Sequence, residues 1–506
     1  MMINKEIQML ENEKWWCGCI SHGSQMPLDN KSNYDVDLYN HATHNQVMPL
    51  MLSSKGRVIW SDSGFRLNTS GGKMSFESHT EIELTDTRGN LMTAYRESKK
   101  YKSSVDFTLD ETLFKVPQYN SWIELMYNQS EDELLKYAQS ILDEGYDPGI
   151  LMIDDNWQED YGVWEFSGSR FRDPKGMIDK MKKMGFKVML WVCPFVSPDS
   201  LTFRQLRDKD YFIKNADGTT AIREWWNGYS AVLDFTNPEA YKWFKEKLDG
   251  LMDDYGVVGF KFDAGDLWNY KEDDITYKKI SPLDQVKLYS EFCSEYEYNE
   301  LRTGFKTAGL PLTQRLCDKH HNWESDGVGG LLPDGILQSM MGFDYNCPDM
   351  IGGGEYLNFI ASSLDLDEEL VVRYAQIAAL FPIMQFSVSP WRVLSKENND
   401  LCLQAAKIHQ KFGDYIIESV HQSIKDNLPL MRHMALMYPE NNYEHLNEQF
   451  MLGDNLLVAP VVSSKQYKKT VYFPQGRWTG DDGSIVEGPC EKEIQVPIGR
   501  LAYYTK

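Results

Sequence analysis

The spacing of apolar residues changes twice along the chain and divides it into three regions. From about Trp15 to Leu109, short alternating or aromatic segments are broken by turn sequences such as N-T-S-G-G-K, which predicts an antiparallel β-domain. From about Ser121 to Ile417, apolar strand-like runs alternate with helical patterns, and this repeated unit favours a (β/α)8 barrel. Past Asn427 short strands return between Gly and Pro residues and predict a second β-domain, a small sandwich.

We therefore expect an α/β protein with an N-terminal β-domain (residues 1–115), a (β/α)8 TIM barrel (116–420) and a C-terminal β-sandwich domain (421–506). Inside the barrel region the pattern predicts helices at about residues 131–144 and 175–184. Asp173-Pro174 supplies the second helix with an N-cap followed by proline. The sequence has no internal repeat and no Gly/Ser-rich linker, so we expect the domains to pack closely.

The segment from Gly256 to Asp266 carries the clearest sign of chemistry. It reads G-V-V-G-F-K-F-D-A-G-D, in which β-branched and aromatic residues predict a strand buried on both faces. Asp263 follows where that strand ends, and the carboxyl ends of barrel strands line the ligand site. Asp263 is therefore a candidate catalytic residue, although an N-cap on a following helix is the structural alternative.

Other acidic and aromatic residues follow predicted strands in the same way, and a barrel would bring them to one mouth. For any single Trp a place in the core is an equal alternative, and Asp234 is also a common turn former. Lys261 lies two residues before Asp263 on the same face of the strand, where it could keep that carboxylate ionised. The candidates are Asp154, Asp155, Trp157, Trp191, Pro194, Trp225, Trp226, Asp234, Lys261, Arg315, Asp318, Trp323 and Asp326.

Two carboxyl groups facing one pocket are what cleavage of a glycosidic bond requires. One group protonates the departing oxygen, and the other attacks the sugar or activates water. The sequence contains no G-x-S-x-G elbow, phosphate-binding loop or H-E-x-x-H helix. His320 and His321 lack the spacing of a metal pair, so we interpret them as loop residues or as support for the site. No metal site is predicted.

The composition narrows the range of partners and locations. The net charge of −23 disfavours nucleic acid and anionic membrane surfaces. The first residues do not resemble a signal peptide, and no run of about twenty apolar residues occurs, so we expect a cytoplasmic location. The eight cysteines are widely scattered and are expected to be reduced, and we interpret the C-x-C pair Cys17 and Cys19 as structural.

Several of these segments resemble glycoside hydrolase family 31, whose members are retaining α-glycosidases with a (β/α)8 barrel between β-domains. The G-F-K-F-D-A-G-D segment is similar to the family's nucleophile strand, which implies that Asp263 is the nucleophile. W-E-S-D-G at Trp323 to Gly327 is similar to the family's W-x-G-D segment, with Ser325 in place of glycine, and implies Asp326 as the acid/base. F-M-L-G-D-N-L-L-V-A-P-V at Phe450 to Val461 resembles the family's entry into the domain after the barrel.

The same resemblance implies a set of substrate-binding residues. Asp154 or Asp155 would hold distal sugar hydroxyls, while Lys261, Arg315 and Trp323 would shape the subsite for the terminal sugar. Asp349 belongs to a segment similar to the family's D-I-G-G turn, and Trp191 and Trp226 complete the expected sugar-binding set. Ser387 stands where many α-glucosidases of the family have a histidine, which argues against glucose specificity.

The I-D-D-N-W and W-W-N-G-Y-S segments look most like the family branch that contains the myogenesis-regulating glycosidase, which is associated with α-galactoside cleavage. We therefore expect a retaining exo-α-glycosidase that acts on α-galactosides and needs no metal or organic cofactor. The open alternatives are an α-glucosidase, α-xylosidase or α-N-acetylgalactosaminidase, a transglycosylase, and a non-catalytic carbohydrate-binding protein. The expected partner is a small oligosaccharide or glycoside, and the short N-terminal domain leaves a homo-oligomer open.

Overall fold

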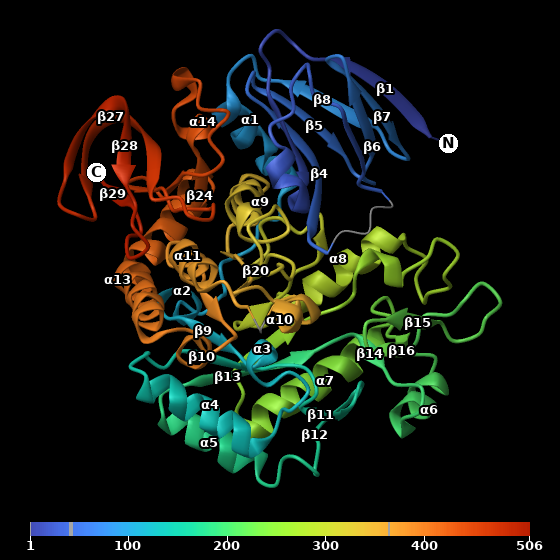
Figure 1. The fold of residues 1–506 in the computed structure, drawn as a ribbon. Helices are drawn as coiled ribbons and strands as arrows, with labels where there is room; N and C mark the ends of the chain where they lie inside the picture. The colour runs from blue at the N-terminus through green and yellow to red at the C-terminus, as the bar shows by residue number, and fades with distance from the viewer. Residues whose placement is uncertain (1, 40–43, 363–364) are drawn as a thin grey trace.

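The computed structural model describes residues 2–39, 44–362 and 365–506 (Figure 1). Its centre is a barrel of short parallel strands, and seven of the strands found in the described ranges are linked in the order β18-β17-β13-β10-β9-β23-β22. The strands β20 and β21 pair with each other and close the barrel between β18 and β22. Gln314 of β20 forms a bridge with Leu301, which follows β18. β21 continues through Pro348 and Asp349 into β22. The barrel strands are β9 (Gln118–Asn120), β10 (Ile150–Ile153), β13 (Lys187–Val192), β17 (Gly259–Phe262), β18 (Asn299–Glu300), β20 (Gln314–Arg315), β21 (Asn346–Cys347), β22 (Met350–Ile351) and β23 (Gln385–Phe386).

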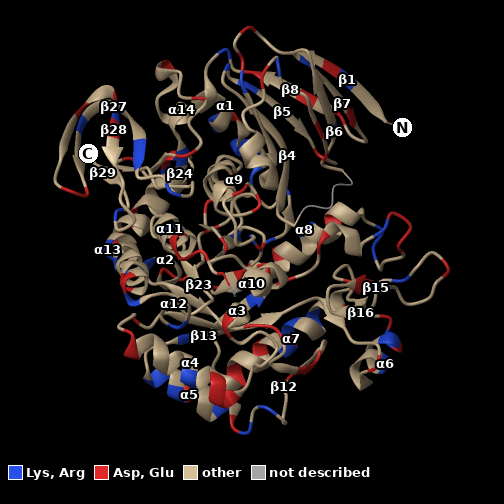
Figure 2. Cartoon of the chain, viewed as in Figure 1, with Lys and Arg blue, Asp and Glu red and all other residues tan. Residues whose placement is uncertain are grey.

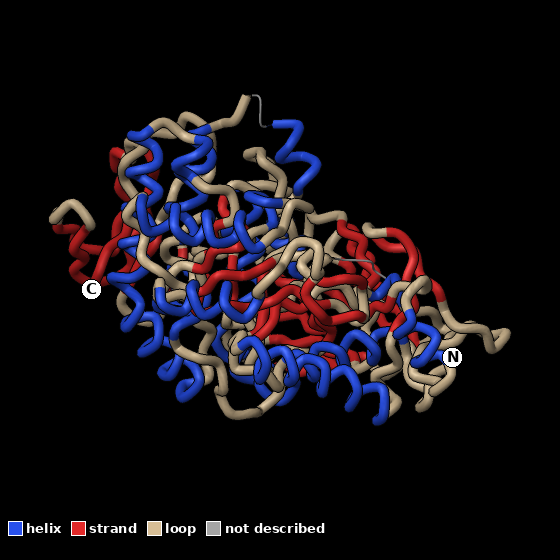
Figure 3. Tube along the Cα trace, turned by 90° about the horizontal axis from the view of Figure 1, so that it is seen from below, coloured by secondary structure: helices blue, strands red, loops and turns tan. Residues whose placement is uncertain are grey.

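Helices enclose these strands, as the view from below shows (Figure 3). The predicted helices are confirmed to within one residue at their ends, as α4 (Glu131–Asp143) and α5 (Pro174–Lys183). The Asp173 side chain accepts a hydrogen bond from the Gly176 amide, so the predicted N-cap is confirmed. Charges of both signs are mixed along these outer helices (Figure 2). The other long helices are α7 (Pro238–Tyr255), α8 (Pro282–Cys293), α9 (Val328–Met340), α11 (Glu368–Ala378) and α13 (Lys396–Asp426).

The N-terminal β-domain consists of two sheets that pack face to face. Strands β6 and β7 alternate between buried and exposed residues, so each turns one face to the core, whereas β4 and β5 are buried along their whole length. The first sheet contains β1 (Ile3–Gln8), β7 (Lys73–Ser78), β6 (Arg66–Ser70) and β3 (Tyr34–Asp37); the second contains β2 (Trp15–Cys19), β4 (Gln46–Ser53), β5 (Arg57–Ser61) and β8 (Ile82–Asp86).

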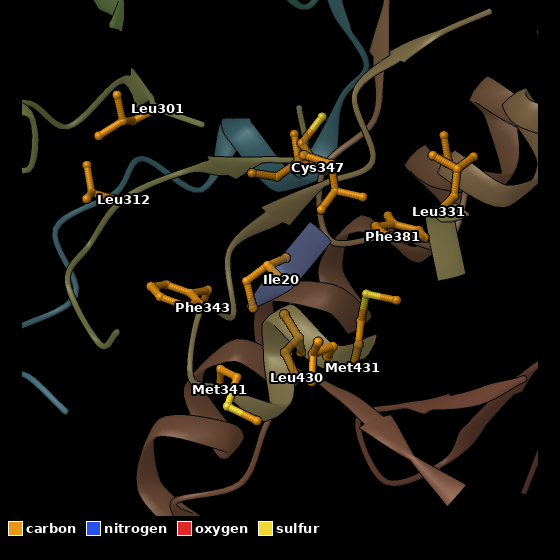
Figure 4. Packing of buried hydrophobic residues seen from close by; sticks show 14 of the residues in the cluster. Ile20, Leu301, Leu312, Leu331, Met341, Phe343, Cys347, Phe381, Leu430 and Met431 are labelled. Carbon is orange, nitrogen blue, oxygen red and sulfur yellow. The ribbon is translucent and has the colours of Figure 1, made fainter. Parts of the chain in front are cut away.

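A strand from the barrel completes the second sheet. β19 (Gly304–Phe305), in the loop between β18 and β20, pairs in parallel with Gln46 and Val47 of β4. The cluster of buried apolar residues is also continuous across the domains. Ile20 of the N-terminal domain lies beside Met341 and Phe343 of the barrel and beside Leu430 and Met431 at the start of the C-terminal domain (Figure 4). The N-terminal domain and the barrel therefore share a core and a sheet.

The C-terminal domain lies beside α13 (Figure 1) and is built on an antiparallel sheet. Its longest strands form a hairpin whose register shifts between Phe473 and Gly476, where the hairpin bends. The strand order is β24 (Met431–His433), β25 (Phe450–Leu452), β26 (Leu456–Val458), β29 (Tyr503–Thr505), β27 (Lys468–Gly480) and β28 (Ile485–Gln495). No helix within the described ranges is long and apolar enough to cross a membrane.

Candidate active site

A cavity of about 440 Å³ opens at the carboxyl ends of the barrel strands. Most of its lining residues lie near the carboxyl ends of β9, β10, β13, β17, β18, β20 and β22 or follow them along the chain, as expected for a TIM barrel, whereas His44 and Trp226 come from elsewhere. They are His44, Trp122, Tyr127, Asp154, Asp155, Trp191, Trp226, Lys261, Asp263, Arg302, Cys317, Asp318, His320, Glu355, Tyr356 and Leu357.

Asp263 lies immediately after β17 with its carboxylate inside this cavity. Its oxygens accept hydrogen bonds from Trp191 Nε1 (3.1 Å), Arg302 Nε (2.8 Å) and the Ala264 amide (2.9 Å). Burial by itself would raise the pKa of Asp263, but the positive charges of Arg302, Lys261 and Arg315 outweigh it and lower the pKa to about 2. The carboxylate is therefore ionised at neutral pH. The N-cap alternative fails, because the next described helical segment, η3, begins only at Leu267.

Arg302 fixes Asp263 in place and was not predicted from the sequence. It comes two residues after β18, donates to Asp263 through Nε, and grips both oxygens of Asp266 through Nη1 (2.8 Å) and Nη2 (3.0 Å). This fork geometry holds the guanidinium rigidly. The two residues of β18 give no periodic pattern in the sequence that would have marked Arg302 as a residue beyond a strand.

Asp154, Asp155 and Lys261 form the buried floor of the cavity. Lys261 Nζ donates to Asp154 at 2.6 Å, and both side chains are 3% exposed. Asp155 accepts hydrogen bonds from Asn227 Nδ2 (2.6 Å), Gln158 Nε2 (3.1 Å) and Tyr161 Oη (3.0 Å). Burial raises the pKa of Asp155 to about 6, and it outweighs the hydrogen bonds from Gln158 and Tyr161, which lower the pKa. Such a floor offers charged donors and acceptors to the hydroxyl groups of a small polar ligand.

Asp318 is a further carboxyl group of the cavity lining, beside Asp154, Asp155, Asp263 and Glu355, and the expectation that Asp326 faces the site has to be corrected. Asp326 does not line the cavity, its side chain is 57% exposed, and it contacts Asn322 and His320 just before α9. Asp318 follows β20 and lines the cavity with a 41% exposed side chain. Arg315 Nη1 holds it at 2.6 Å. Asp318 was among the candidates from the sequence, and it precedes the aspartate of the W-E-S-D motif by 326 − 318 = 8 positions.

Three predicted sugar-binding residues lie outside the cavity lining. Trp323 points its indole N–H at Asp367 (2.8 Å) and packs against the core, so it does not reach the site. Arg315 and Asp349 are buried behind the site, where Arg315 Nη1 bridges Asp318 and Asp349 (2.7 Å). They can support the acid at position 318 but do not face a ligand. The predicted residues Asp154, Asp155, Trp191, Trp226, Lys261 and Asp263 do line the cavity.

Apart from Asp318 and His320, which the sequence had already drawn attention to, the remaining lining residues were not predicted, because they lie in loops or short helices whose course the sequence pattern does not define. Trp122 begins the short helix α3 (Trp122–Leu125), and Tyr356 and Leu357 begin α10 (Tyr356–Ser362). His44 comes from the N-terminal domain, so that domain contributes to the wall of the cavity. No group of three or more His, Cys, Asp or Glu side chains suited to a metal ion occurs in the part of the chain that the structure describes.

A sugar-sized hollow at the mouth of a TIM barrel, lined by several carboxyl groups above a charged floor, is the type of site found in glycoside hydrolases. The sequence matches the profile of the glycosyl hydrolases family 31 TIM-barrel domain over residues 113–418 and that of the family's C-terminal domain over residues 427–506. The chain belongs to glycosyl hydrolase family 31.

Two curated relatives and one solved structure illustrate the range of similarity. The myogenesis-regulating glycosidase of Mus musculus is 31% identical over 78% of this chain and 56% of its own length. An α-xylosidase of Lactiplantibacillus pentosus is 26% identical over 87% of this chain and 60% of its own. This chain therefore spans little more than half of these relatives. The family 31 dextranase of Flavobacterium johnsoniae complexed with glucose has the same fold, with a TM-score of 0.86 and 19% identity over all of this chain and 66% of that one.

Proposed function

We propose that this protein is a retaining exo-α-glycosidase in which Asp263 is the nucleophile and Asp318 the general acid/base. The observation that carries the proposal is that these two carboxyl groups line one cavity in different surroundings. Asp263 is buried and held ionised by cations, whereas Asp318 stands at a more open position. An ionised carboxylate can attack the anomeric carbon, and a solvent-accessible one can exchange protons with water.

The proposed reaction has two steps, each of which balances within the site. First, Asp263 attacks the anomeric carbon while Asp318 gives its proton to the glycosidic oxygen, and the bond between the anomeric carbon and that oxygen breaks. Then Asp318, now a carboxylate, takes a proton from water, and the water oxygen displaces Asp263 from the sugar. Two inversions at one carbon give net retention of configuration.

The closed, charged floor supports removal of a terminal sugar rather than cleavage inside a polymer. Asp154, Asp155 and Lys261 are buried to within a few per cent at that end of the cavity, so a single ring that binds there has no room for a further sugar behind it. For the sugar itself we propose an α-galactoside, which the resemblance of the I-D-D-N-W and W-W-N-G-Y-S segments implies. An α-glucoside, α-xyloside or α-N-acetylgalactosaminide is the alternative within the same machinery.

A panel of 4-nitrophenyl α-glycosides tests the proposal. We expect release of nitrophenol with preference for the α-galactoside, and abolition of turnover by Asp263→Asn, which is isosteric but cannot attack. Preference for another α-sugar would replace the galactoside assignment, and substantial turnover by Asp263→Asn would remove Asp263 from the mechanism. Product analysis at high acceptor concentration separates hydrolysis from transglycosylation. Sugar binding without any cleavage would favour a carbohydrate-binding protein.

The cytoplasmic location and a homo-oligomer stay predictions.

A further inference from the structure

The mouth of the cavity carries apolar side chains that are open to solvent. Large hydrophobic residues in this protein are mostly buried, yet Trp226 is 47% exposed, Tyr127 is 42% exposed and Leu357 is 64% exposed. All three line the same cavity as Asp263, together with the ring of Tyr356. We call Tyr127, Trp226, Tyr356 and Leu357 the apolar rim. Exposed apolar groups gathered around a polar floor are typical of a surface that contacts an apolar part of a ligand.

Trp226 is presented by a hairpin that is fixed to the cavity floor. It lies in the turn between β15 (Ile222–Trp225) and β16 (Gly228–Val232), and its ring lies over the Arg302 guanidinium, 5.5 Å from centroid to carbon. Its neighbour Asn227 donates from Nδ2 to Asp155 (2.6 Å) and to Tyr161 Oη (2.8 Å). The turn is therefore tied to two groups at the site, and the indole ring has a defined position at the mouth.

The other rim residues come from two different loops that meet beside this turn. Tyr127 and Tyr356 contact edge to face with ring centroids 5.6 Å apart, and Trp122 packs against both rings. Tyr127 Oη donates to Asn227 Oδ1 at 3.3 Å, which connects this aromatic group to the Trp226 hairpin. Leu357 follows Tyr356 at the start of α10. The rim is thus a connected set of side chains rather than scattered surface residues.

The positions of the two carboxyl groups show which part of a substrate would meet this rim. The side chain of Asp263 is 12% exposed and that of Asp318 is 41% exposed, so the acid lies on the solvent side of the nucleophile. The leaving group must lie against the acid that protonates its oxygen. It therefore points out of the cavity, past the apolar rim, while the cleaved sugar occupies the floor.

We propose that the apolar rim is a leaving-group subsite that selects α-glycosides whose aglycone presents a flat apolar ring face. This inference rests on the proposed function, because it places the leaving group beside Asp318. Two sources share the required chemistry, an aryl ring and the C–H face of a second pyranose, and both stack on aromatic side chains.

The nitrophenyl panel first identifies the preferred sugar. The experiment then compares the methyl α-glycoside, the benzyl α-glycoside and an α-linked disaccharide of that sugar. Methyl and benzyl alcohols are leaving groups of similar chemical reactivity, so their ratio of kcat/KM reports contacts with the rim. We expect the benzyl compound to be preferred by about ten-fold, the size of one aromatic stacking contact. Trp226→Ala should bring this ratio towards one. Tyr229→Ala is the matched control, because Tyr229 is a 61% exposed aromatic residue of the same hairpin that does not line the cavity.

Binding to Asp263→Asn, measured by calorimetry, makes the result independent of cleavage. If the benzyl compound binds more tightly than the methyl compound and Trp226→Ala removes this difference, the leaving-group subsite is supported. This holds even when the wild-type protein cleaves no substrate, a result that would overturn only the proposed hydrolase. Equal kcat/KM ratios and equal affinities for methyl and benzyl compounds would overturn the rim and leave the hydrolase standing. A preference for the disaccharide over the benzyl compound identifies the second ring as a sugar, and the reverse order identifies an aryl aglycone.

Discussion

At the scale of single residues, the site depends on carboxylates that follow barrel strands within three residues and are held in place by buried arginines. Arg302 secures Asp263, and Arg315 secures Asp318 while it is itself held by Glu300 at 3.0 Å and Asp349 at 2.7 Å. Each arginine is buried and makes more than one hydrogen bond to carboxylates. The directions of the reacting oxygens are therefore fixed before a substrate binds, which is a condition for efficient catalysis.

The first prediction separates Asp318 from Asp326. Asp318→Ala should lower kcat/KM by about 10²–10⁴-fold for alkyl glycosides, the usual contribution of a general acid, and less for nitrophenyl glycosides, which need little protonation. Added azide should restore part of the turnover, because azide attacks the glycosyl-enzyme without a base. Asp326→Ala is the control and should stay close to wild type, since Asp326 lies outside the cavity. The reverse pattern would return the acid/base role to Asp326.

The second prediction concerns pH and Asp155. Burial raises the pKa of Asp155 from 3.8 to about 6, so the folded protein holds this proton more tightly than the unfolded chain does. Its contribution to stability is full below pH 3.8 and is lost as pH rises through about 6, a change of about 3 kcal/mol. Asp155→Asn has no carboxyl group to titrate at this position. The Tm of the wild type should therefore fall more between pH 4 and pH 7 than the Tm of the variant. Parallel Tm curves would show that Asp155 keeps an ordinary pKa.

The sequence was sufficient where a run of strand-forming residues precedes the functional residue and insufficient where no such run occurs. Asp263 could be predicted because four of the seven residues from Gly256 to Phe262 are Val or Phe. β18 and β20 have two residues each, so no periodicity marks their ends and Arg302 and Asp318 could not be assigned from pattern alone. The motif-based choice then selected Asp326, which does not line the cavity.

At the scale of elements, short segments at the carboxyl end of the barrel are positioned by single buried polar contacts. α3 places Trp122 in the cavity wall, and the Ile123 amide in the same helix donates to Ser387 Oγ at 2.7 Å. Ser387 is fully buried just after β23. The position of the cavity wall therefore depends on a small side chain at residue 387. This helix could not be predicted from the sequence, because four residues do not establish a period.

The third prediction follows from that contact. Ser387→His introduces the histidine that many α-glucosidases of the family have at the matching position. It should lower the free energy of unfolding by about 1–3 kcal/mol, because the larger ring overpacks the buried site. It should also weaken turnover without creating α-glucoside cleavage. Ser387→Ala is the matched control, because it removes only the hydrogen bond, a loss of about 1 kcal/mol. Differential scanning calorimetry and the nitrophenyl panel measure both effects. A stable Ser387→His variant that cleaves α-glucosides would show that the wall can move to admit the ring.

Longer elements followed their sequence signals closely. α7 has Asn237 as its N-cap, proline at the first helical position and Gly256 in the left-handed conformation (φ 74°) at its end. The helix leads through this turn into β17 and so sets the position of Asp263. Local signals of this kind place an element along the chain, but they say nothing about the loops that close the cavity.

At the scale of the whole molecule, the N-terminal domain is part of the framework of the barrel. The Gly23 amide donates to Asp334 Oδ1 of α9 at 3.0 Å, and Lys319 Nζ donates to Oδ2 of the same carboxylate at 2.7 Å. The side chains of Lys319 and Asp334 are 3% and 2% exposed. Lys319 is the residue after Asp318, so this ion pair connects the contact between the domains to the loop that carries Asp318 into the cavity lining. Composition and periodicity predicted the domains but not this connection.

The fourth prediction tests the connection. Asp334→Ala leaves the Lys319 ammonium buried without its partner and should cost about 3–5 kcal/mol. The double variant Lys319→Met, Asp334→Leu removes both charges and should recover most of that loss. Thermal unfolding measures stability, and limited proteolysis shows whether the N-terminal domain has loosened. Equal Tm values for the wild type and Asp334→Ala would show that the pair contributes little to holding the domains together.

The pairing of β19 with β4 also constrains how the protein is made. β4 ends at Ser53 and its partner begins at Gly304, so 303 − 53 = 250 residues separate the two strands in order of synthesis. While the ribosome adds those residues, the Gln46–Val47 end of β4 offers free backbone groups to any passing strand. A chaperone that shields nascent chains should therefore raise the yield of folded protein most when it acts before residue 304 emerges.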